Sequence, residues 1–486
     1  MLDTPATSAD AADSGRARSL PLARVAAFVL STLVGAGLWV LLRRGLFDGQ
    51  AQSYDAPLYV RSLWGIAHGD YNNSLIDYPS LAIHTQCALL VLAPLARVWH
   101  AADVLIAAQA FAFAGTLFVW LSALLRASPA RPAVTLLLAS WACLLFMYGM
   151  PLVANPFVFD VRPEMLGVLL ATAGLLRSAE RQGFDAAAVT LLLLSAAARE
   201  EFALVAACGL TLSPVARVGP GWSLRTRAIT AGALVLYGVC NSYLWTRDTS
   251  QAAHLNSAAS WPDLALAKLQ LTAAFVASGG GLAALGYRWL GSALPGLALL
   301  ALSSWMANDQ VSFHYGMFVA PALLTASYAG YASLVRRSQL PRAWLGAHAA
   351  VALACAAWLS ALPGGTRFAR QHFDLQGSLL APATWRAHTG WLADVHRILQ
   401  SVPRDQSLLL QYVFAAPYAD RQSIRVLEVD NPTPWQPDAV FLPQALWATR
   451  GVQLRAQGYR LASLAGSSFA LMTRREGPAL KQVLSA

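Results

Sequence analysis

Hydrophobic residues recur in long runs through the first 362 positions of the chain, and short loops with polar and charged residues separate them. A run of about 20 apolar residues is what a helix needs to cross the hydrocarbon core of a bilayer. The pattern therefore predicts a polytopic α-helical membrane protein of about 11 spans. The expected spans are 21–42, 103–125, 133–152, 163–177, 185–198, 202–214, 228–246, 265–287, 291–306, 313–334 and 343–362.

Three apolar segments depart from this simple pattern. The segments 185–198 and 202–214 are short, so we expect a hairpin that enters the bilayer and turns at Arg199-Glu200-Glu201. The segment Leu81–Trp99 is apolar enough to span, but it is interrupted by His84, Gln86, Pro94 and Arg97. We interpret it as helices that lie at the membrane interface.

Composition supports the membrane interpretation and narrows the classes of function. The chain is 56% hydrophobic and 12% charged, whereas soluble domains carry about 25% charged residues. Its net charge of +10 suggests nucleic acid as a partner, but arginines in short loops also orient membrane helices, and no dense basic cluster occurs. The five cysteines lie in apolar segments without CxxC spacing, so neither a disulfide framework nor a cysteine metal site is expected.

Loop charge predicts the orientation of the chain. If residues 1–20 are cytoplasmic and Leu81–Trp99 does not cross, most loop arginines lie on the cytoplasmic side, as the positive-inside rule requires. A crossing at Leu81–Trp99 would leave the cytoplasmic side without its full set of Arg126, Arg131, Arg177 and Arg181. The same orientation places most loop carboxylates outside, together with the C-terminal region.

The composition becomes that of a soluble domain after Pro363. An amphipathic helix is expected near Thr389–Leu399, and strands are expected at Ser407–Phe414, Ile424–Val429, Ala439–Leu442 and Phe469–Thr473. We therefore expect a disordered cytoplasmic N-terminus (1–20), a transmembrane domain (21–362) with a first external loop (43–102), and a small external α/β domain (363–486).

Ionisable groups near membrane depth are costly and indicate a functional site by default. The expected outer face holds eight candidates: Asp55, His84, Asp160, Glu164, Arg199, Glu200, Glu201 and His314. All but His84 have a plainer alternative. Asp55 precedes Ala56-Pro57 and could be a helix cap, a role that asparagine would fill equally well. Asp160 and Glu164 could complement a helix dipole, the Arg199-Glu200-Glu201 run could be a structural ion pair, and His314 could be a packing residue.

A carboxylate with a cation and a histidine nearby suits general-base activation of a hydroxyl group. The planar fork of arginine matches phosphate oxygens. Together these groups suggest transfer from a lipid-linked phosphate donor. The chain lacks HExxH, P-loop and GxSxG motifs, which argues against metalloprotease, ATPase and α/β-hydrolase chemistry.

Several motifs, taken in order, resemble the DUF2079 family of predicted bacterial membrane proteins. They are Tyr54-Asp55 with Trp64 and Ala67-His68-Gly69, then His84 with Leu92-Ala93-Pro94-Leu95, Gln109, Asn155–Glu164, Ala198-Arg199-Glu200-Glu201, Phe313-His314-Tyr315, and Val402-Pro403 with Asp405, Ser407, Pro417 and Arg421. The chain departs from the family pattern at Val60-Arg61, where the family has Asp-Gln, at Arg162, where it has His, and at Arg199, where it has Lys.

The resemblance implies a GT-C type glycosyltransferase that uses a polyprenyl-phosphate sugar donor at an external active site. Asp55 would be the general base, and Arg199 with His314 would bind the donor phosphate. His84, Asp160, Glu164, Glu200 and Glu201 would orient the substrate or a divalent cation such as Mg²⁺ or Mn²⁺. A single displacement of this kind predicts inversion at the anomeric carbon.

The resemblance also implies a multi-pass protein of the bacterial inner (cytoplasmic) membrane, with lipid, donor and an unidentified acceptor as partners and no nucleic acid. Two other functions stay open. The same groups could bind cargo in a transporter or flippase of a lipid-linked or acidic solute, although no inverted repeat is evident. The chain could also be a non-catalytic scaffold or sensor that acts through residues 363–486.

Overall fold

The computed structural model describes part of the 486-residue chain, and every structural statement below concerns that part. The described residues are 8–47, 55–76, 78–81, 86–127, 142, 153, 157, 161–214, 222–241, 265, 268–269, 272, 275, 282–302, 314–336, 382–427, 435–465 and 469–474. The chain divides into two compact units. Unit 1 comprises residues 1–38, 109–159 and 164–370, and unit 2 comprises residues 39–108, 160–163 and 371–486.

Two described helices are long and apolar enough to cross a membrane, and both agree with expected spans. They are Arg24–Phe47 within α1 (Ser8–Phe47), and α4 (Ala101–Ala127). In unit 1 these helices run antiparallel. The ring centroids of Phe28 and Phe118 lie 6.2 Å apart, and Gly35 faces Ala114 so closely that an added Cβ would lie 2.7 Å from the Cβ of Ala114.

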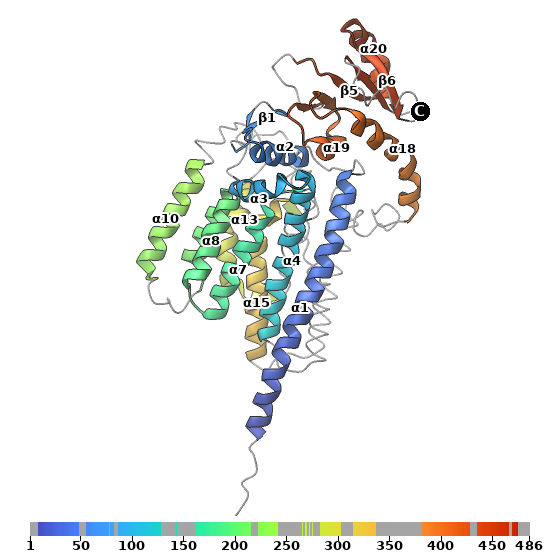
Figure 1. The fold of residues 1–486 in the computed structure, drawn as a ribbon. Coiled ribbons are helices and arrows are strands. Elements are labelled where there is room, and N and C mark those ends of the chain that lie inside the picture. Colours follow the sequence, from blue (N-terminus) through green and yellow to red (C-terminus); the bar gives the residue numbers. More distant parts are fainter. Residues whose placement is uncertain are drawn as a thin grey trace, which may run out of the picture. The chain divides into compact units, whose positions relative to one another are not determined.

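Unit 1 continues with a set of shorter apolar helices that pack side by side (Figure 1). They are α7 (Met165–Arg181), α8 (Ala186–Ala198), α9 (Glu201–Leu212) and α10 (Leu224–Cys240). The turn between α7 and α8 uses Gln182 in the left-handed region (φ 52°) and Asp185 as the N-cap of α8. The helix pair expected on either side of Arg199-Glu200 is confirmed as α8 and α9.

The rest of unit 1 packs through close backbone approaches. It comprises η3 (Tyr287–Ala293), α13 (Leu294–Leu302), η4 (His314–Phe318) and α15 (Ala320–Arg336). A Cβ added at Gly330 would lie 1.9 Å from the carbonyl oxygen of Leu282, so only glycine fits there. Trp120 of α4 is fully buried and donates from Nε1 to the carbonyl oxygen of Leu324 in α15 at 3.1 Å.

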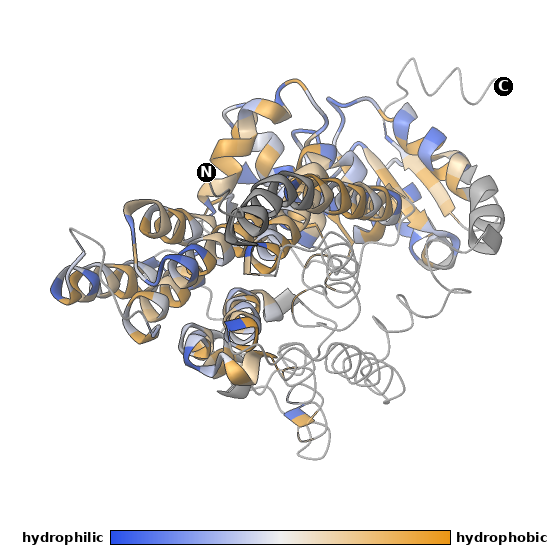
Figure 2. Cartoon of the chain, turned by 90° about the horizontal axis from the view of Figure 1, so that it is seen from below, coloured by the Kyte–Doolittle hydropathy of each residue, from blue (hydrophilic) through white to orange (hydrophobic). Residues whose placement is uncertain are grey.

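Hydrophobic residues dominate the described helices, and hydrophilic residues gather mainly in loops and at helix ends (Figure 2). This is the pattern expected of apolar helices joined by polar connections. The expected spans 133–152, 265–287 and 343–362 fall wholly or mostly outside the described residues. Membrane crossing is therefore supported by two helices, and the count of about 11 stays a prediction.

Unit 2 begins with the segment expected to be the first external loop. Helix α2 (Asp55–Ala67) starts at Asp55 and is followed by a hairpin of β1 (Asn72–Asn73) and β2 (Tyr78–Pro79). Helix α3 (Cys87–Ala96) follows, with Pro94 inside it. Its ten residues correspond to about 15 Å of helix, half the thickness of a bilayer core.

The C-terminal part of unit 2 is an α/β fold around a five-stranded mixed sheet. The strands are β3 (Leu408–Leu410), β4 (Ile424–Val426), β5 (Ala439–Pro443), β6 (Arg460–Ala465) and β7 (Phe469–Thr473), in the order β4-β3-β5-β7-β6. Strands β4, β3 and β5 are parallel, whereas β7 pairs antiparallel with β5 and β6. The helices are α18 (Pro382–Ser401), α19 (Tyr412–Ala415), η5 (Ala416–Tyr418) and α20 (Gln444–Ala456).

The sequence located most of these elements. Its expected strand Ser407–Phe414 is too long, because the strand ends at Leu410 and a helix starts at Tyr412. Strand β6 and helix α20 were not predicted. Val440, Leu442, Tyr459 and Met472 form the buried core on one side of the sheet.

Unit 2 also joins two regions that the sequence treats separately, residues 39–108 and 371–486. The side chain of Arg61 donates from Nη2 to the carbonyl oxygen of Gln422 at 3.0 Å. The hydroxyl of Ser74 donates to the carbonyl oxygen of Ile424 at 3.2 Å. The segment of the chain around α2 is therefore anchored to the C-terminal fold.

Candidate functional site

Asp55 is the first residue of helix α2, and its carboxylate forms an ion pair with Arg162 through Oδ2 and Nη2. The side chain of Arg162 is 3% exposed and that of Asp55 is 27% exposed. Arg162 also lies over the ring of Tyr59, one turn further along α2, with its Cζ 5.9 Å from the ring centroid. The pair thus consists of a buried cation and a solvent-accessible carboxylate.

This geometry gives Asp55 more than the role of a helix cap. The guanidinium of Arg162 fixes the direction of the carboxylate, and the carboxylate stays partly accessible to solvent. The sequence predicted the position of Asp55 at the start of a helix. It did not predict the partner, because Arg162 stands out in the sequence only as a loop arginine and as a departure from the histidine of the family pattern.

In unit 1, Arg199 lies between two carboxylates. Its Nη1 donates to Oε1 of Glu164 at 3.0 Å, and its Nε and Nη2 donate to the two oxygens of Glu201 at 2.8 and 2.9 Å. Glu164, Glu200 and Arg199 are buried. The Cζ of Arg199 lies 5.4 Å from the ring centroid of Phe318.

These contacts are those of the structural ion pair that the sequence offered as the alternative for Arg199-Glu200-Glu201. A bidentate pair with Glu201 uses the same fork that a phosphate would need. Two carboxylates around one guanidinium also make the surroundings of Arg199 unfavourable for a further anion. The geometry therefore favours Arg199 as the residue that holds Glu164 and Glu201 in place.

The motif Arg162-Pro163-Glu164 supplies one residue to each ion pair, Arg162 to Asp55 and Glu164 to Arg199. The remaining predicted site residues are not tested in this way. His84 and Asp160 lie outside the described residues, and only the backbone of His314 is described, as the first residue of η4. Among the described residues, no group of three or more His, Cys, Asp or Glu side chains could hold a metal ion.

Arg61 stands where the family pattern has glutamine. It is buried and forms an ion pair with Asp70 through Nη2 and Oδ2, and its Nε donates to the hydroxyl of Ser74 at 3.1 Å. With its bond to Gln422, Arg61 connects α2, the β1 hairpin and the C-terminal fold. Its role in the structure is anchoring.

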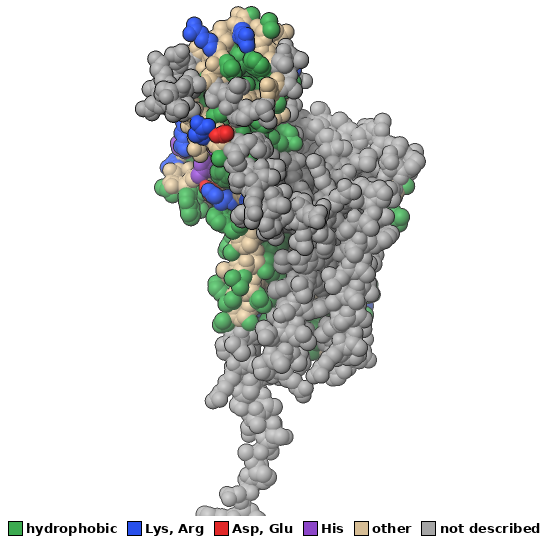
Figure 3. Space-filling model, turned by 90° about the vertical axis from the view of Figure 1, so that its right-hand side faces the viewer, with side chains coloured by type: hydrophobic (Ala, Val, Ile, Leu, Met, Phe, Trp, Pro, Cys, Tyr) green, Lys and Arg blue, Asp and Glu red, His purple; other side chains and the backbone are tan. Residues whose placement is uncertain are grey.

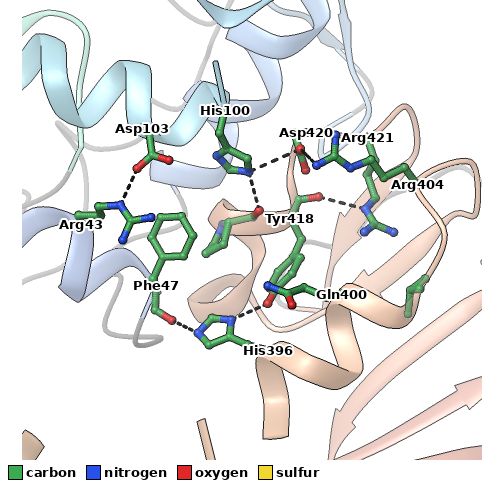
Figure 4. A pocket seen from close by; sticks show the side chains of 12 residues that line it. Arg43, Phe47, His100, Asp103, His396, Gln400, Arg404, Tyr418, Asp420 and Arg421 are labelled. Atoms are coloured by element: carbon green, nitrogen blue, oxygen red, sulfur yellow. Dashed lines mark hydrogen bonds and ion pairs between the residues drawn. The ribbon is translucent and has the colours of Figure 1, made fainter. Parts of the chain in front are cut away.

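A pocket of about 310 Å³ opens in unit 2, and none of the predicted site residues lines it (Figure 4). Its walls come from the end of α1, the start of α4, helix α18 and the segment 402–421. The lining residues are Arg43, Phe47, His100, Asp103, His396, Gln400, Val402, Arg404, Pro417, Tyr418, Asp420 and Arg421. Of these residues, the sequence singled out Val402, Pro417 and Arg421 as part of the C-terminal resemblance, and Arg43 and Asp103 only as loop charges of the expected outer face.

The pocket is held together by hydrogen bonds and ion pairs between distant segments. His396 bridges the hydroxyl of Tyr418, through Nδ1, and the backbone carbonyl of Phe47, through Nε2. Nε2 of His100 donates to the carbonyl oxygen of Pro417 at 3.0 Å. Burial raises the pKa of the Tyr418 hydroxyl and lowers the pKa of the Arg421 guanidinium to about 10.

Comparison with known proteins agrees with the resemblance seen in the motifs. No curated protein matches the chain significantly. The model of the DUF2079 family, described as a predicted membrane protein, matches residues 46–444. This range includes both ion pairs and all but one of the residues that line the pocket. The chain therefore belongs to the DUF2079 family of predicted membrane proteins.

Proposed function

We propose that the protein is an integral membrane glycosyltransferase of the GT-C type, which transfers a sugar from a polyprenyl-phosphate donor to an acceptor hydroxyl on the external face. The observation that carries the proposal is the pairing of Asp55 with Arg162. An accessible carboxylate at a helix start is fixed by a buried arginine from a segment 107 positions away. A carboxylate that serves only as a cap does not need such a partner.

In the proposed reaction, Asp55 accepts the proton of the acceptor hydroxyl while the hydroxyl oxygen attacks the anomeric carbon. The bond between that carbon and the phosphate oxygen breaks, and polyprenyl phosphate leaves with the electron pair. One displacement inverts the configuration of the anomeric carbon. Arg162 keeps the carboxylate in position for the proton transfer, as general-base catalysis requires.

The contacts of Arg199 change one part of this scheme. Because its fork is engaged by Glu164 and Glu201, we assign it the role of positioning these two carboxylates. Glu164 and Glu201, with Glu200, Asp160 and His84, stay candidates to orient the sugar, the acceptor or a divalent cation. His314 stays the candidate for the donor phosphate.

The structure also supports an external first loop. Arg43 at the end of α1 and Asp103 at the start of α4 form an ion pair at 2.8 Å. If α1 and α4 both cross the membrane, the segment between them starts and ends on the same side. Helix α3 is too short to cross, so we propose that residues 48–100 stay on that side, with the N-terminus cytoplasmic and the C-terminal fold external at a bacterial inner membrane.

The experiment that tests the function uses the purified full chain in proteoliposomes with a panel of polyprenyl-phosphate sugars and added glycan and lipid acceptors. We expect one donor to release polyprenyl phosphate with time, and we expect the product to carry the inverted anomeric configuration. A donor that binds and crosses the bilayer without release would contradict the proposal and favour a flippase.

A further inference from the structure

The pocket at the ends of α1 and α4 has a surplus of positive charge. Three arginines line it, against two carboxylates. Each carboxylate already has a cationic partner: Asp103 pairs with Arg43 at 2.8 Å, and Asp420 pairs with Arg404 at 3.1 Å. His100 lies 3.5 Å from the same oxygen of Asp420. The positive charge of the third arginine, Arg421, is therefore not neutralised by a carboxylate of its own.

The guanidinium of Arg421 has a donor group, Nη2, that the described residues do not use. Its side chain is buried, yet it contacts only backbone carbonyls: Nε donates to Tyr418 at 3.1 Å, and Nη1 lies 3.4 Å from both Pro403 and Gln406. Within the described part of the chain, no hydrogen bond from Nη2 is seen. Arg421 lines the pocket together with Gln400 and Tyr418 (Figure 4), so a buried, unused guanidinium donor is available to a ligand.

The other cationic groups are arranged to complete such a contact. Arg404, whose side chain is 75% exposed, pairs with Asp420 at the pocket. The guanidinium of Arg404 lies largely in solvent, and the buried Asp420 keeps His100 at 3.5 Å when Arg404 turns to a ligand. Blue arginine, purple histidine and red acidic side chains lie next to each other on one face of the molecule (Figure 3).

The position of the pocket within the chain also bears on the ligand. Arg43 lies just before the last turn of one candidate span, and Asp103 lies in the first turn of the other. Trp39, one turn before Arg43, is exposed, and the Cζ of Arg43 lies 5.9 Å from its ring centroid. Exposed tryptophan beside arginine is typical of the membrane–water interface, where the phosphate head groups of lipids lie.

We propose that this pocket binds a phosphate ester group, which either an anionic lipid head group or a soluble phosphate supplies. Nη2 of Arg421 and the fork of Arg404 donate to the phosphate oxygens, and the amide of Gln400 lies on the same pocket wall. A volume of about 310 Å³ is at the lower end of the range for small-molecule sites, which suits a head group and not a whole lipid. The site is independent of the transfer chemistry proposed for Asp55.

The test compares two variants of the full chain in nanodiscs. Arg404→Gln removes the exposed pocket arginine and should leave the fold intact. Arg397→Gln is the matched control, because Arg397 lies on α18, is 58% exposed and pairs with Asp394 at 2.7 Å, but does not line the pocket. The soluble arm titrates inorganic phosphate against protein in phosphatidylcholine nanodiscs and follows the ³¹P signal. The lipid arm counts phosphatidic acid molecules retained on the protein by native mass spectrometry.

We expect one of the two probes to bind the wild-type chain and Arg404→Gln to weaken that binding about tenfold, the effect of one charge-assisted contact. Arg397→Gln should bind like wild type. Binding of inorganic phosphate would identify a soluble ligand, and retention of phosphatidic acid alone would identify a lipid. Absence of binding in both arms would overturn the proposal, and so would equal effects of the two variants, because equal effects would mean that only general surface charge matters.

Discussion

At the scale of single residues, the environment of Arg199 shows why a charged residue in an apolar segment need not bind substrate. Removing a guanidinium from water costs several kcal/mol. In this protein the cost is offset by hydrogen bonds to Glu164 and Glu201 and by the ring of Phe318. Removal of any one member of this set takes a partner from a charged group, and the loss is largest where the remaining group is fully buried.

Arg199→Gln should therefore destabilise unit 1 strongly, by about 3–5 kcal/mol, because it leaves the fully buried Glu164 without its ion-pair partner. Glu201→Gln should cost less, since the side chain of Glu201 is partly exposed. Thermal unfolding of the purified variants in detergent measures the difference. If Arg199→Gln unfolds at the wild-type temperature, Arg199 does not hold the two carboxylates in place. It then becomes a candidate for binding the donor phosphate again.

The sequence identified the charged residues of both ion pairs, but it paired them only where they are neighbours. Arg199 and Glu201 are two positions apart, and their pairing was an explicit alternative. Asp55 and Arg162 are separated by 107 positions, and no pattern in a single sequence reports which distant side chains meet. The pocket was not predicted for the same reason. Its residues come from four segments, and none of them stands out from the local sequence pattern of its segment.

At the scale of elements, local sequence signals predicted the bounds of a helix where a capping residue marks its start. Asp185 accepts a hydrogen bond from the backbone N–H of Ala188 at 2.8 Å, and this cap fixes the start of α8 where the sequence placed it. Strand β6 and helix α20 lack such signals. Strand β6 lies at the edge of the sheet and pairs only with β7, so much of its stability comes from its neighbour and little from its own sequence.

Glycine at position 330 tests the packing of these elements. A Cβ at Gly330 would lie 1.9 Å from the carbonyl oxygen of Leu282, a backbone atom that cannot move without displacing its helix. Gly330→Ala should therefore lower the melting temperature or abolish expression. Gly37→Ala is the control: Gly37 lies within α1 with nothing within 4 Å of an added Cβ, and alanine favours a helix over glycine by about 1 kcal/mol.

Equal stability of Gly330→Ala and Gly37→Ala would show that α15 does not approach the segment around Leu282 as closely as described. The measurement is fluorescence-detected size-exclusion chromatography after heating, which needs little protein. A lower midpoint for Gly330→Ala alone is the result that the packing predicts.

At the scale of the whole chain, the first loop and the C-terminal fold belong to one compact unit, although more than 250 residues separate them in the sequence. The sequence predicts an external first loop at 43–102 and a separate external domain at 363–486. It did not predict their association, because the contacts are made by backbone carbonyls, as in the bonds from Arg61 to Gln422 and from His100 to Pro417. Every residue type has the same backbone carbonyl, so the identity of a residue does not indicate that its carbonyl accepts such a bond.

The proposed topology is testable in a cysteine-free variant. Single cysteines at Asn72 and Val98, both exposed on either side of α3, should react with a membrane-impermeant maleimide from the same side. A cysteine at Ser128, after α4, should react from the opposite side. Labelling of Asn72→Cys and Val98→Cys from different sides would show that the segment containing α3 crosses the membrane.

The catalytic role of Asp55 requires a more careful variant than Asp55→Asn alone. Asparagine caps a helix about as well as aspartate, which by itself suggests unchanged stability. The structure corrects this expectation, because the buried guanidinium of Arg162 loses its carboxylate partner in that variant.

We expect Asp55→Asn to lower the free energy of unfolding by about 1–3 kcal/mol, so a loss of activity in this variant alone would not separate catalysis from folding. The double variant Asp55→Asn with Arg162→Gln removes both charges and should recover most of the stability.

Release of polyprenyl phosphate by wild type, Asp55→Asn and the double variant, each at matched folded concentration, tests the catalytic role of Asp55 most directly. If Asp55 is the general base, both variants lose about 10²–10⁴-fold in rate, and the recovered stability of the double variant does not restore turnover. If the double variant regains near-wild-type release, Asp55 serves only to neutralise Arg162, and the proposed mechanism is contradicted.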